Sequence, residues 1–89
     1  MDREIHIFSS LSDIFVTNKS IKIKSRKGKR LTLLSLSSYT YFKATTGLKY
    51  SLVEERLLFS PARGLSNEFI SDEASLDIEE GILLIIKEI

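Results

Sequence analysis

The densest group of side chains that could bind a ligand is the basic run KIKSRKGKR, residues 22–30. Six of these nine residues are Lys or Arg, and none is acidic. Such a run can bind the phosphates of a nucleic acid or nucleotide, and the nearby Tyr39, Tyr41 and Phe42 could stack on bases. The alternative is an exposed hairpin whose lysines keep an edge strand from pairing with other chains. A formal net charge of only +1, and the lack of a recognisable RNA-binding aromatic motif, favour the alternative and argue against nucleic acid as a partner.

Residue types that usually perform catalysis are scarce. The chain has one histidine and no cysteine, which excludes disulfides, cysteine nucleophiles and histidine-rich or thiolate metal sites. His6 lies in an alternating segment typical of a strand, so a structural role is favoured. The acidic pairs at 54–55 and 72–73 lie in predicted turns, where solvated charge is the usual state. The segment RKGKRL, 26–31, has one glycine and no helical pattern after it, unlike a phosphate-binding loop. No catalytic residue and no metal ligand is therefore assigned, and the chain alone does not look like a self-sufficient enzyme.

Alternation of apolar and polar residues is the dominant pattern of the elements that must position these side chains. It is clearest in SIKIKSR, 20–26, and EASLDIE, 73–79, and it indicates strands with one face in solvent. The stretch 31–46 is long enough for two strands or one bent strand. The last segment, 81–89, is apolar at consecutive positions and is expected to be a strand buried on both faces. Turn residues separate these runs. The pattern predicts an all-β fold, an antiparallel sandwich or barrel, and we adopt a small jelly-roll-like β-sandwich that forms a single domain over 1–89.

The stretch TTGLKYSL, 45–52, is expected to be a bent strand with Leu48, Tyr50 and Leu52 on one face. The overlapping SLVEERLL, 51–58, allows two structures. Its capping-box spacing from Ser51 to Glu54 is typical of a helical turn. A hairpin with a loop of about two to four residues around 54–56 explains the charges equally well and is preferred.

Three short motifs follow one another in the second half of the chain: TTGLKYSL at 45–52, RGLSNEF at 63–69 and EEGILLII at 79–86. Their types, order and spacing resemble the C-terminal domain of bacterial thiamin pyrophosphokinases. In that family a T-x-G-L-K-[YW]-x-L element precedes a G-[IL]-S-N-E element and a final G-x-L-L-[VI] strand. The matching residues are Thr45, Gly47, Leu48, Lys49, Tyr50 and Leu52, then Gly64, Leu65, Ser66, Asn67 and Glu68, then Gly81, Leu83, Leu84 and Ile85.

An earlier segment, KGKRLTLLSLS at 27–37, adds to this resemblance. It matches the family at Gly28, Leu33, Leu36 and Ser37. Thr32 stands where serine is usual, and Ser35 where proline is usual; neither change should remove a strand. The resemblance covers residues 20–88.

The resemblance implies a division of labour between two domains. This chain would be the thiamin-binding and dimerisation domain of an enzyme that transfers pyrophosphate from ATP to the thiamin hydroxyl, giving thiamin diphosphate and AMP. ATP and magnesium would bind to an N-terminal catalytic domain, which this chain lacks, and the active site would form between the subunits of a homodimer. The chain itself is expected to hold no cofactor and to be inactive alone.

Thiamin carries a positive thiazolium and a flat aminopyrimidine, and the motifs contain residues suited to both. Tyr50 offers an aromatic face, with a cation–π contribution of ~0.5–2 kcal/mol. Gly47 would let the backbone approach the ligand. Ser66 and Asn67 match the pyrimidine nitrogens, and Thr45 could line the same pocket, as could its neighbour. The full predicted thiamin site is Tyr50, Ser66, Asn67, Thr45, Thr46 and Gly47.

Each of these residues also has an ordinary structural interpretation. Tyr50 could be core packing beside its leucines, Ser66 and Asn67 a simple turn, and the threonines strand formers. Lys49 is expected to point away from Tyr50, into solvent or toward an acid. Glu68 could balance the thiazolium charge or pair with Arg63.

Three functions therefore remain open: a thiamin-binding domain, which is preferred, a nucleic-acid-binding module that uses residues 22–30, and a purely structural dimerisation domain. A chain of 89 residues with 43% hydrophobic residues can bury one core. Its longest apolar run, 82–86, is too short to span a bilayer, and MDREIHIF is charged where a signal peptide is apolar. Together with the absence of cysteine, this predicts a cytoplasmic protein without a membrane partner.

Overall fold

The computed structural model describes residues 5–8, 12–60 and 65–89, with 5–8 described by their backbone. Within these ranges the chain forms nine strands and no helix. The strands are β1 Ile5–Phe8, β2 Ser12–Thr17, β3 Ile21–Lys24, β4 Arg30–Ser35, β5 Tyr39–Thr46, β6 Glu55–Leu58, β7 Leu65–Glu68, β8 Glu73–Glu80 and β9 Leu83–Glu88.

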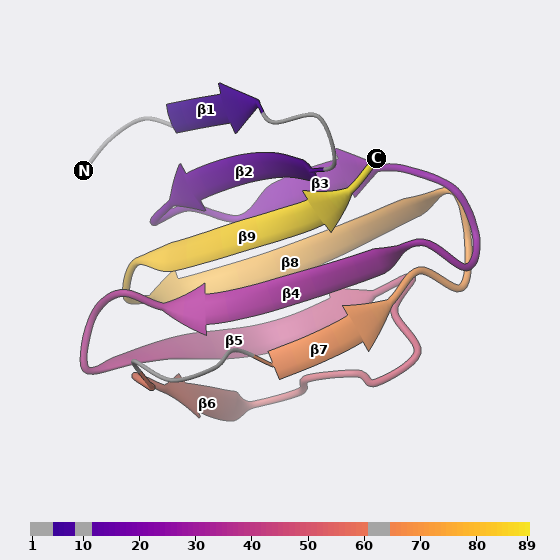
Figure 1. Ribbon diagram of the computed structural model, residues 1–89. Coiled ribbons are helices and arrows are strands. Elements are labelled where there is room, and N and C mark those ends of the chain that lie inside the picture. Colours follow the sequence, from indigo (N-terminus) through magenta and orange to yellow (C-terminus); the bar gives the residue numbers. More distant parts are fainter. Residues whose placement is uncertain (1–4, 9–11, 61–64) are drawn as a thin grey trace.

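Two antiparallel sheets pack face to face (Figure 1). One has the order β1-β2-β9-β4-β7 and the other the order β3-β8-β5-β6. Without β1, this is the strand order of an eight-stranded jelly roll built from two Greek keys. The predicted jelly-roll-like β-sandwich is confirmed. Strand β1 extends the larger sheet at its edge by pairing with β2, so that His6 lies opposite Phe15.

The core lies between the sheets and is formed by the inward half of each alternating pattern. Leu31, Leu33 and Ile85 of the larger sheet, and Phe42 and Leu76 of the smaller one, are all buried. Each such side chain stabilises the fold by about 1.5–3 kcal/mol relative to its exposed state. The alternation predicted for 20–26 and 73–79 is confirmed in β3 and β8. The stretch 31–46 forms two strands: β4 belongs to the larger sheet and β5 to the smaller one.

The basic run 22–30 is not a hairpin, and this prediction was wrong. Strand β3 pairs with β8, whereas β4 pairs with β9 and β7, so the run crosses from one sheet to the other. Strand β3 is nevertheless an edge strand, and its Lys22 and Lys24 are exposed. This arrangement agrees with lysines that protect a sheet edge.

Strand β9 is buried on one face only, so the expectation of two buried faces was wrong. Leu83 and Ile85 point into the core and are fully buried. Leu84 and Ile86 alternate with them and are half-buried on the outer face of the larger sheet. The continuous apolar run therefore marks an apolar outer face and not a second core layer.

The stretch 45–52 is not a continuous strand. Strand β5 ends at Thr46, Gly47 has a φ of 77°, and Leu48 makes an isolated bridge with Phe69. Leu48 is 2% exposed and Tyr50 57% exposed, so the expected shared face was wrong. The helical alternative for 51–58 is wrong as well, because β5 and β6 form a hairpin through the loop 47–54.

That hairpin loop is longer than predicted and is what places the candidate site. Glu54 ends the loop with a φ of 50°, and Glu55 and Arg56 belong to β6 instead of a tight turn. The loop leaves the smaller sheet and contacts β7, the edge strand of the larger sheet. No helix in the described residues is long and apolar enough to cross a membrane.

Candidate functional site

Asn67 anchors the loop 47–54 to β7. Its register partner in β4 is the buried Leu31, so its side chain is on the inward face and only 3% of the residue is exposed. The side-chain oxygen accepts hydrogen bonds from the N–H of Tyr50, at 3.0 Å, and from the N–H of Glu68, at 2.9 Å. The side-chain nitrogen donates to the Tyr50 carbonyl at 2.8 Å. The Asn67 amide therefore holds both main-chain groups of Tyr50.

Further hydrogen bonds fix the loop at both ends. The N–H of Ile70 donates to the Gly47 carbonyl at 2.9 Å, and the N–H of Lys49 donates to the Glu68 carbonyl at 2.9 Å. On the far side, the N–H of Leu52 donates to the hydroxyl of Thr45 at 2.9 Å. A loop held in this way presents its side chains in fixed positions, which reduces the ordering cost of binding.

Gly47 is required by its neighbours in β8. A Cβ at this position would lie 2.1 Å from the carbonyl oxygen of Glu73 and 2.9 Å from the Cα of Ala74. Its φ of 77° is also one that glycine adopts readily and other residues rarely do. Gly47 therefore permits a close approach to β8, and the approach to a ligand that was expected of it stays a prediction.

Tyr50 and Asn67 share a hollow with a volume of about 300 Å³. The residues that line it are Arg30, Lys49, Tyr50, Ser66, Asn67 and Glu68. Tyr50 is exposed at its edge, and the Lys49 ammonium lies over the ring, 5.5 Å from the centroid. Lys49 was expected to point away from Tyr50, so that expectation was wrong.

The side chains that line the hollow are better suited to binding a ligand than to catalysis. Tyr50 supplies an aromatic ring, Ser66 a hydroxyl and Glu68 a carboxylate, while Arg30 and Lys49 bring two positive charges. In the described ranges, no group of three His, Cys, Asp or Glu side chains could hold a metal ion. The hollow is open to solvent, and a flat heterocycle could enter it and stack with its face on the ring of Tyr50.

Three of the six predicted site residues meet in this hollow: Tyr50, Ser66 and Asn67. Thr45 is buried and holds the loop through Leu52, and Thr46 points to the other side, with its hydroxyl 2.5 Å from that of Ser75. These two threonines and Gly47 are not among the residues that line it. Contact of any of the six with thiamin stays a prediction.

Sequence reasoning did not assign Arg30 to the site, and it set Lys49 aside. Arg30 lies directly opposite Glu68 in the β4–β7 pair. This pairing could not be predicted from the local sequence pattern of either strand. Glu68 does line the hollow, as its first interpretation required. Its suggested partner Arg63, and Gly64 of the same motif, lie outside the described residues.

A separate polar contact perturbs Tyr39, at the start of β5. Its hydroxyl donates a hydrogen bond to the Glu80 carboxylate, and this bond, with partial desolvation and the Glu80 charge, raises the pKa of Tyr39 above its usual value. The Arg56 guanidinium, 5.0 Å from the ring centroid, acts in the opposite direction. Tyr39 does not line the hollow, so we assign this contact a structural role in the pairing of β5 with β8 in the smaller sheet.

Known structures share this architecture. The thiamin pyrophosphokinase of Geobacillus thermodenitrificans matches with a TM-score of 0.85 and 23% identity, over 99% of this chain and 42% of that chain. The thiamine pyrophosphokinase of Bacillus subtilis matches with a TM-score of 0.80 and 19% identity, over 96% and 41%. Yeast thiamin pyrophosphokinase matches with a TM-score of 0.74 and 21% identity, over 97% and 30%. At these identities the likeness shows the fold, and the chain spans less than half the length of each of these proteins.

Sequence comparison identifies the family directly. No curated protein sequence matches the chain at a significant level. Residues 16–83 match the family model described as thiamin pyrophosphokinase, vitamin B1 binding domain. This match covers most of the chain and includes the motifs at 45–52 and 64–68. The resemblance drawn from those motifs is therefore confirmed, and the chain belongs to the family of the vitamin B1-binding domain of thiamin pyrophosphokinase.

Proposed function

We propose that this chain contributes thiamin binding to a thiamin pyrophosphokinase, through the hollow beside Tyr50. The family match carries this proposal, because its motif residues Tyr50, Ser66 and Asn67 converge in the fold on one hollow. Thiamin presents a flat ring, hydrogen-bonding nitrogens and one positive charge. The hollow offers an aromatic face, a hydroxyl and the carboxylate of Glu68.

The roles within the hollow follow from what each side chain still has free. Tyr50 stacks on a ring of the ligand, and the exposed Ser66 hydroxyl bonds to a pyrimidine nitrogen. Asn67 already makes three hydrogen bonds to the main chain, so it positions Tyr50 and does not bind the ligand. Glu68 faces the positive thiazolium and balances its charge.

Lys49 opposes the binding of a cation. Its ammonium occupies one face of the Tyr50 ring, and a thiazolium needs such a face for a cation–π contact. The ligand therefore displaces Lys49 toward Glu68 or takes the other face of the ring. Either arrangement makes Lys49 a residue that weakens binding in this chain alone.

The reaction belongs to the larger enzyme. We propose that the complete protein transfers pyrophosphate from ATP to the thiamin hydroxyl, works as a cytoplasmic homodimer, and holds ATP and magnesium in its catalytic domain. The donor groups described in this chain do not fit a magnesium site, so no step is assigned to the metal here. The share of this chain is to orient the thiamin hydroxyl for attack, and without its partner domain it is inactive.

A titration of the chain with thiamin, followed by backbone amide NMR, tests the binding step. We expect saturable shifts at 49–50 and 66–68. Tyr50→Ala should weaken binding about 2- to 30-fold, the range of a cation–π contact. Phe59→Ala is the matched control, because Phe59 is also an aromatic residue about half exposed, 52% against 57%, and does not line the hollow. Lys49→Gln should strengthen binding, whereas Lys43→Gln, the same change at an exposed site of β5, should not.

A chimera makes the test decisive for the enzyme. In it, this chain replaces the matching 42% of the Geobacillus thermodenitrificans protein. Tyr50→Ala should raise KM for thiamin and leave KM for ATP unchanged. No shifts at the hollow on titration, together with an unchanged thiamin KM in an active chimera, would overturn the proposed site.

A further inference from the structure

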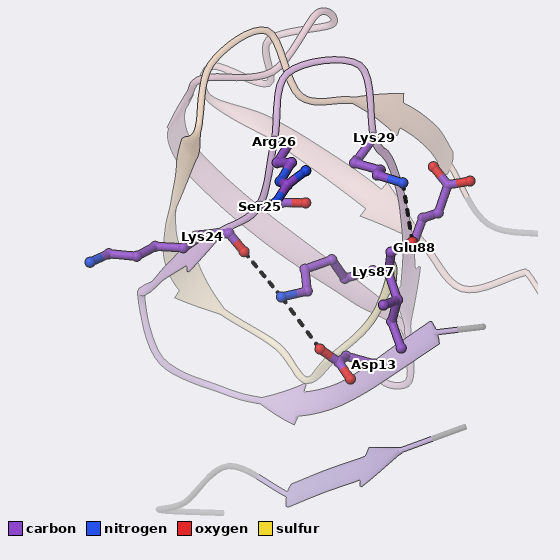
Figure 2. A pocket seen from close by; sticks show the side chains of 8 residues that line it. Asp13, Lys24, Ser25, Arg26, Lys29, Lys87 and Glu88 are labelled. Carbon is purple, nitrogen blue, oxygen red and sulfur yellow. Dashed lines mark hydrogen bonds and ion pairs between the residues drawn. The ribbon is translucent and has the colours of Figure 1, made fainter. Parts of the chain in front are cut away.

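At one end of the sandwich, the inward-facing positions change from apolar to charged. Lys87 of β9 lies opposite Leu31 of β4 and Asp13 of β2, so all three share the inner face of the larger sheet. Ser25 and Arg26 follow β3 on the facing sheet. The result is a hollow of about 410 Å³ between the sheets (Figure 2). Its lining residues are Asp13, Lys24, Ser25, Arg26, Lys29, Lys87, Glu88 and Ile89.

Two lysines at this hollow, Lys29 and Lys87, have ammonium N–H groups beyond those used in contacts with the protein. The Lys87 ammonium lies 3.4 Å from the Asp13 carboxylate and donates to the Lys24 carbonyl at 3.0 Å. Only 18% of the Lys87 side chain is exposed, and its ammonium also lies 5.8 Å from the centre of the Phe15 ring. The Lys29 ammonium donates to the main-chain oxygen of Ile89 at 3.2 Å. Because an ammonium has three protons, one proton of Lys87 and two of Lys29 have no acceptor among the residues that the structure describes.

The remaining donors have even fewer acceptors. Across the described ranges, neither the Arg26 guanidinium nor the Ser25 hydroxyl has a hydrogen-bond or ion-pair partner in the protein. Arg26 is exposed, and its guanidinium carries five N–H groups. Both side-chain carboxylates of the hollow already have partners. Asp13 faces Lys87, and Glu88 accepts the N–H of Arg30 at 2.9 Å. Figure 2 shows the Lys24 ammonium directed away from the hollow, so Lys24 contributes its carbonyl.

We propose that this hollow binds a phosphate-type oxyanion. Arg26 binds two of its oxygens, since a guanidinium matches phosphate bidentately, and Lys29 and the Ser25 hydroxyl donate to the others. Lys87 forms the floor and supplies charge from a partly desolvated position, where electrostatic attraction is stronger. The ligand is free phosphate or the phosphate group of a small molecule. This site shares no lining residue with the hollow beside Tyr50 and is independent of thiamin binding.

The placement of these donors around one hollow favours a single phosphate group over a polyanion. A nucleic acid needs an open basic surface along which successive phosphates can lie. Here Ser25, Arg26 and Lys29 line one hollow, whereas Lys22 and Lys27 of the basic run do not line it. The basic run is thus divided between a built anion site and a protected strand edge.

Amide NMR titration of the chain with inorganic phosphate tests the proposal, with sodium chloride at equal ionic strength as the reference. We expect saturable shifts at residues 25–29 and 87–88, with a Kd at or below about 1 mM. Arg26→Gln should weaken binding about tenfold, as expected for a lost charge-assisted bidentate contact. Lys27→Gln removes the same charge from the same turn but not from the hollow, and should change Kd less than twofold, about the effect of an exposed charge. A second variant, Lys29→Gln, should weaken binding as Arg26→Gln does.

Further arms identify the ligand and the outcomes that would overturn the proposal. Binding of a nucleoside monophosphate with the same dependence on Arg26 would identify the ligand as a phosphate-bearing small molecule. Binding of inorganic phosphate alone would identify it as the free ion. Absence of saturable shifts with both probes would refute it. Equal losses in Arg26→Gln and Lys27→Gln would show diffuse charge attraction instead of a site. Tighter binding of single-stranded RNA, weakened equally by Lys22→Gln and Arg26→Gln, would show a nucleic-acid surface.

Discussion

At the scale of single residues, Asn67 acts through the main chain of Tyr50. Its amide makes three hydrogen bonds in a nearly closed environment, two to Tyr50 and one to Glu68. A buried amide that already makes three of its four possible hydrogen bonds is a poor ligand for a substrate, because giving up any of these bonds would cost on the order of 1–3 kcal/mol. Sequence reasoning named Asn67 as a site residue, and Asn67 does line the hollow. Such reasoning could not identify the partner of the amide, which depends on where a loop from the other sheet is held.

Asn67→Ala tests this positioning role. We expect the free energy of unfolding to fall by about 2–3 kcal/mol, because two N–H groups and a carbonyl lose their partner. Ser66→Ala, at an exposed neighbour in the same strand, should change it by less than about 0.5 kcal/mol. Urea denaturation measures both. In the thiamin titration, the loss of affinity caused by Asn67→Ala should disappear in a Tyr50→Ala background, because both changes remove the same contact between Tyr50 and the ligand. Additive losses would show that Asn67 binds the ligand itself.

At the scale of elements, the alternating strands were predictable, whereas β7 and the loop 47–54 were not. Strands β3 and β8 each have one face in the core and one in solvent, so the alternation in their sequences records their structure directly. In the loop, Leu48 and Leu52 are buried in the core, while Tyr50 between them is exposed and its main chain is held by Asn67. The two leucines imitate the period of a strand, but their burial comes from tertiary contacts.

Gly47 ends β5 and starts this loop, and a pair of substitutions separates its two constraints. Gly28 and Gly47 both have a positive φ, 94° and 77°, but a Cβ meets nothing within 4 Å at Gly28 and meets the Glu73 carbonyl at 2.1 Å at Gly47. Gly28→Ala should therefore cost about 1 kcal/mol of stability from backbone strain alone. Gly47→Ala should cost at least about 2 kcal/mol more, because β8 or the loop must move.

Equilibrium denaturation of both glycine variants, with the thiamin titration as a second readout, checks this expectation. Gly47→Ala should also weaken thiamin binding, since the displaced loop carries Tyr50, whereas Gly28→Ala should not. Equal losses of stability in the two variants would show that the contact with Glu73 relaxes without cost. The close approach at Gly47 would then have no role in holding the site.

At the scale of the whole molecule, the larger sheet has an apolar outer face. Val16, Leu84 and Leu34 lie side by side across β2, β9 and β4, and Ile14 and Ile86 form a second row beside them. All five are half-buried, although they point away from the core. The apolar run in β9 suggested burial on both faces from its sequence. The second face is apolar, but no described element of this domain covers it.

We expect this face to form the proposed homodimer, because a symmetric interface needs a surface that is complementary to itself, and a flat apolar sheet face satisfies that condition. Leu84→Lys places a charge at the centre of the face and should convert dimers to monomers in sedimentation velocity. The monomers should remain folded, since Leu84 is not in the core. Ser75→Lys, which adds the same charge to the half-buried outer side of the central strand β8, should remain dimeric. A parent chain that sediments as a monomer at every concentration would contradict the assignment and leave the face to the catalytic domain; a Leu84→Lys dimer would place the interface elsewhere on the domain.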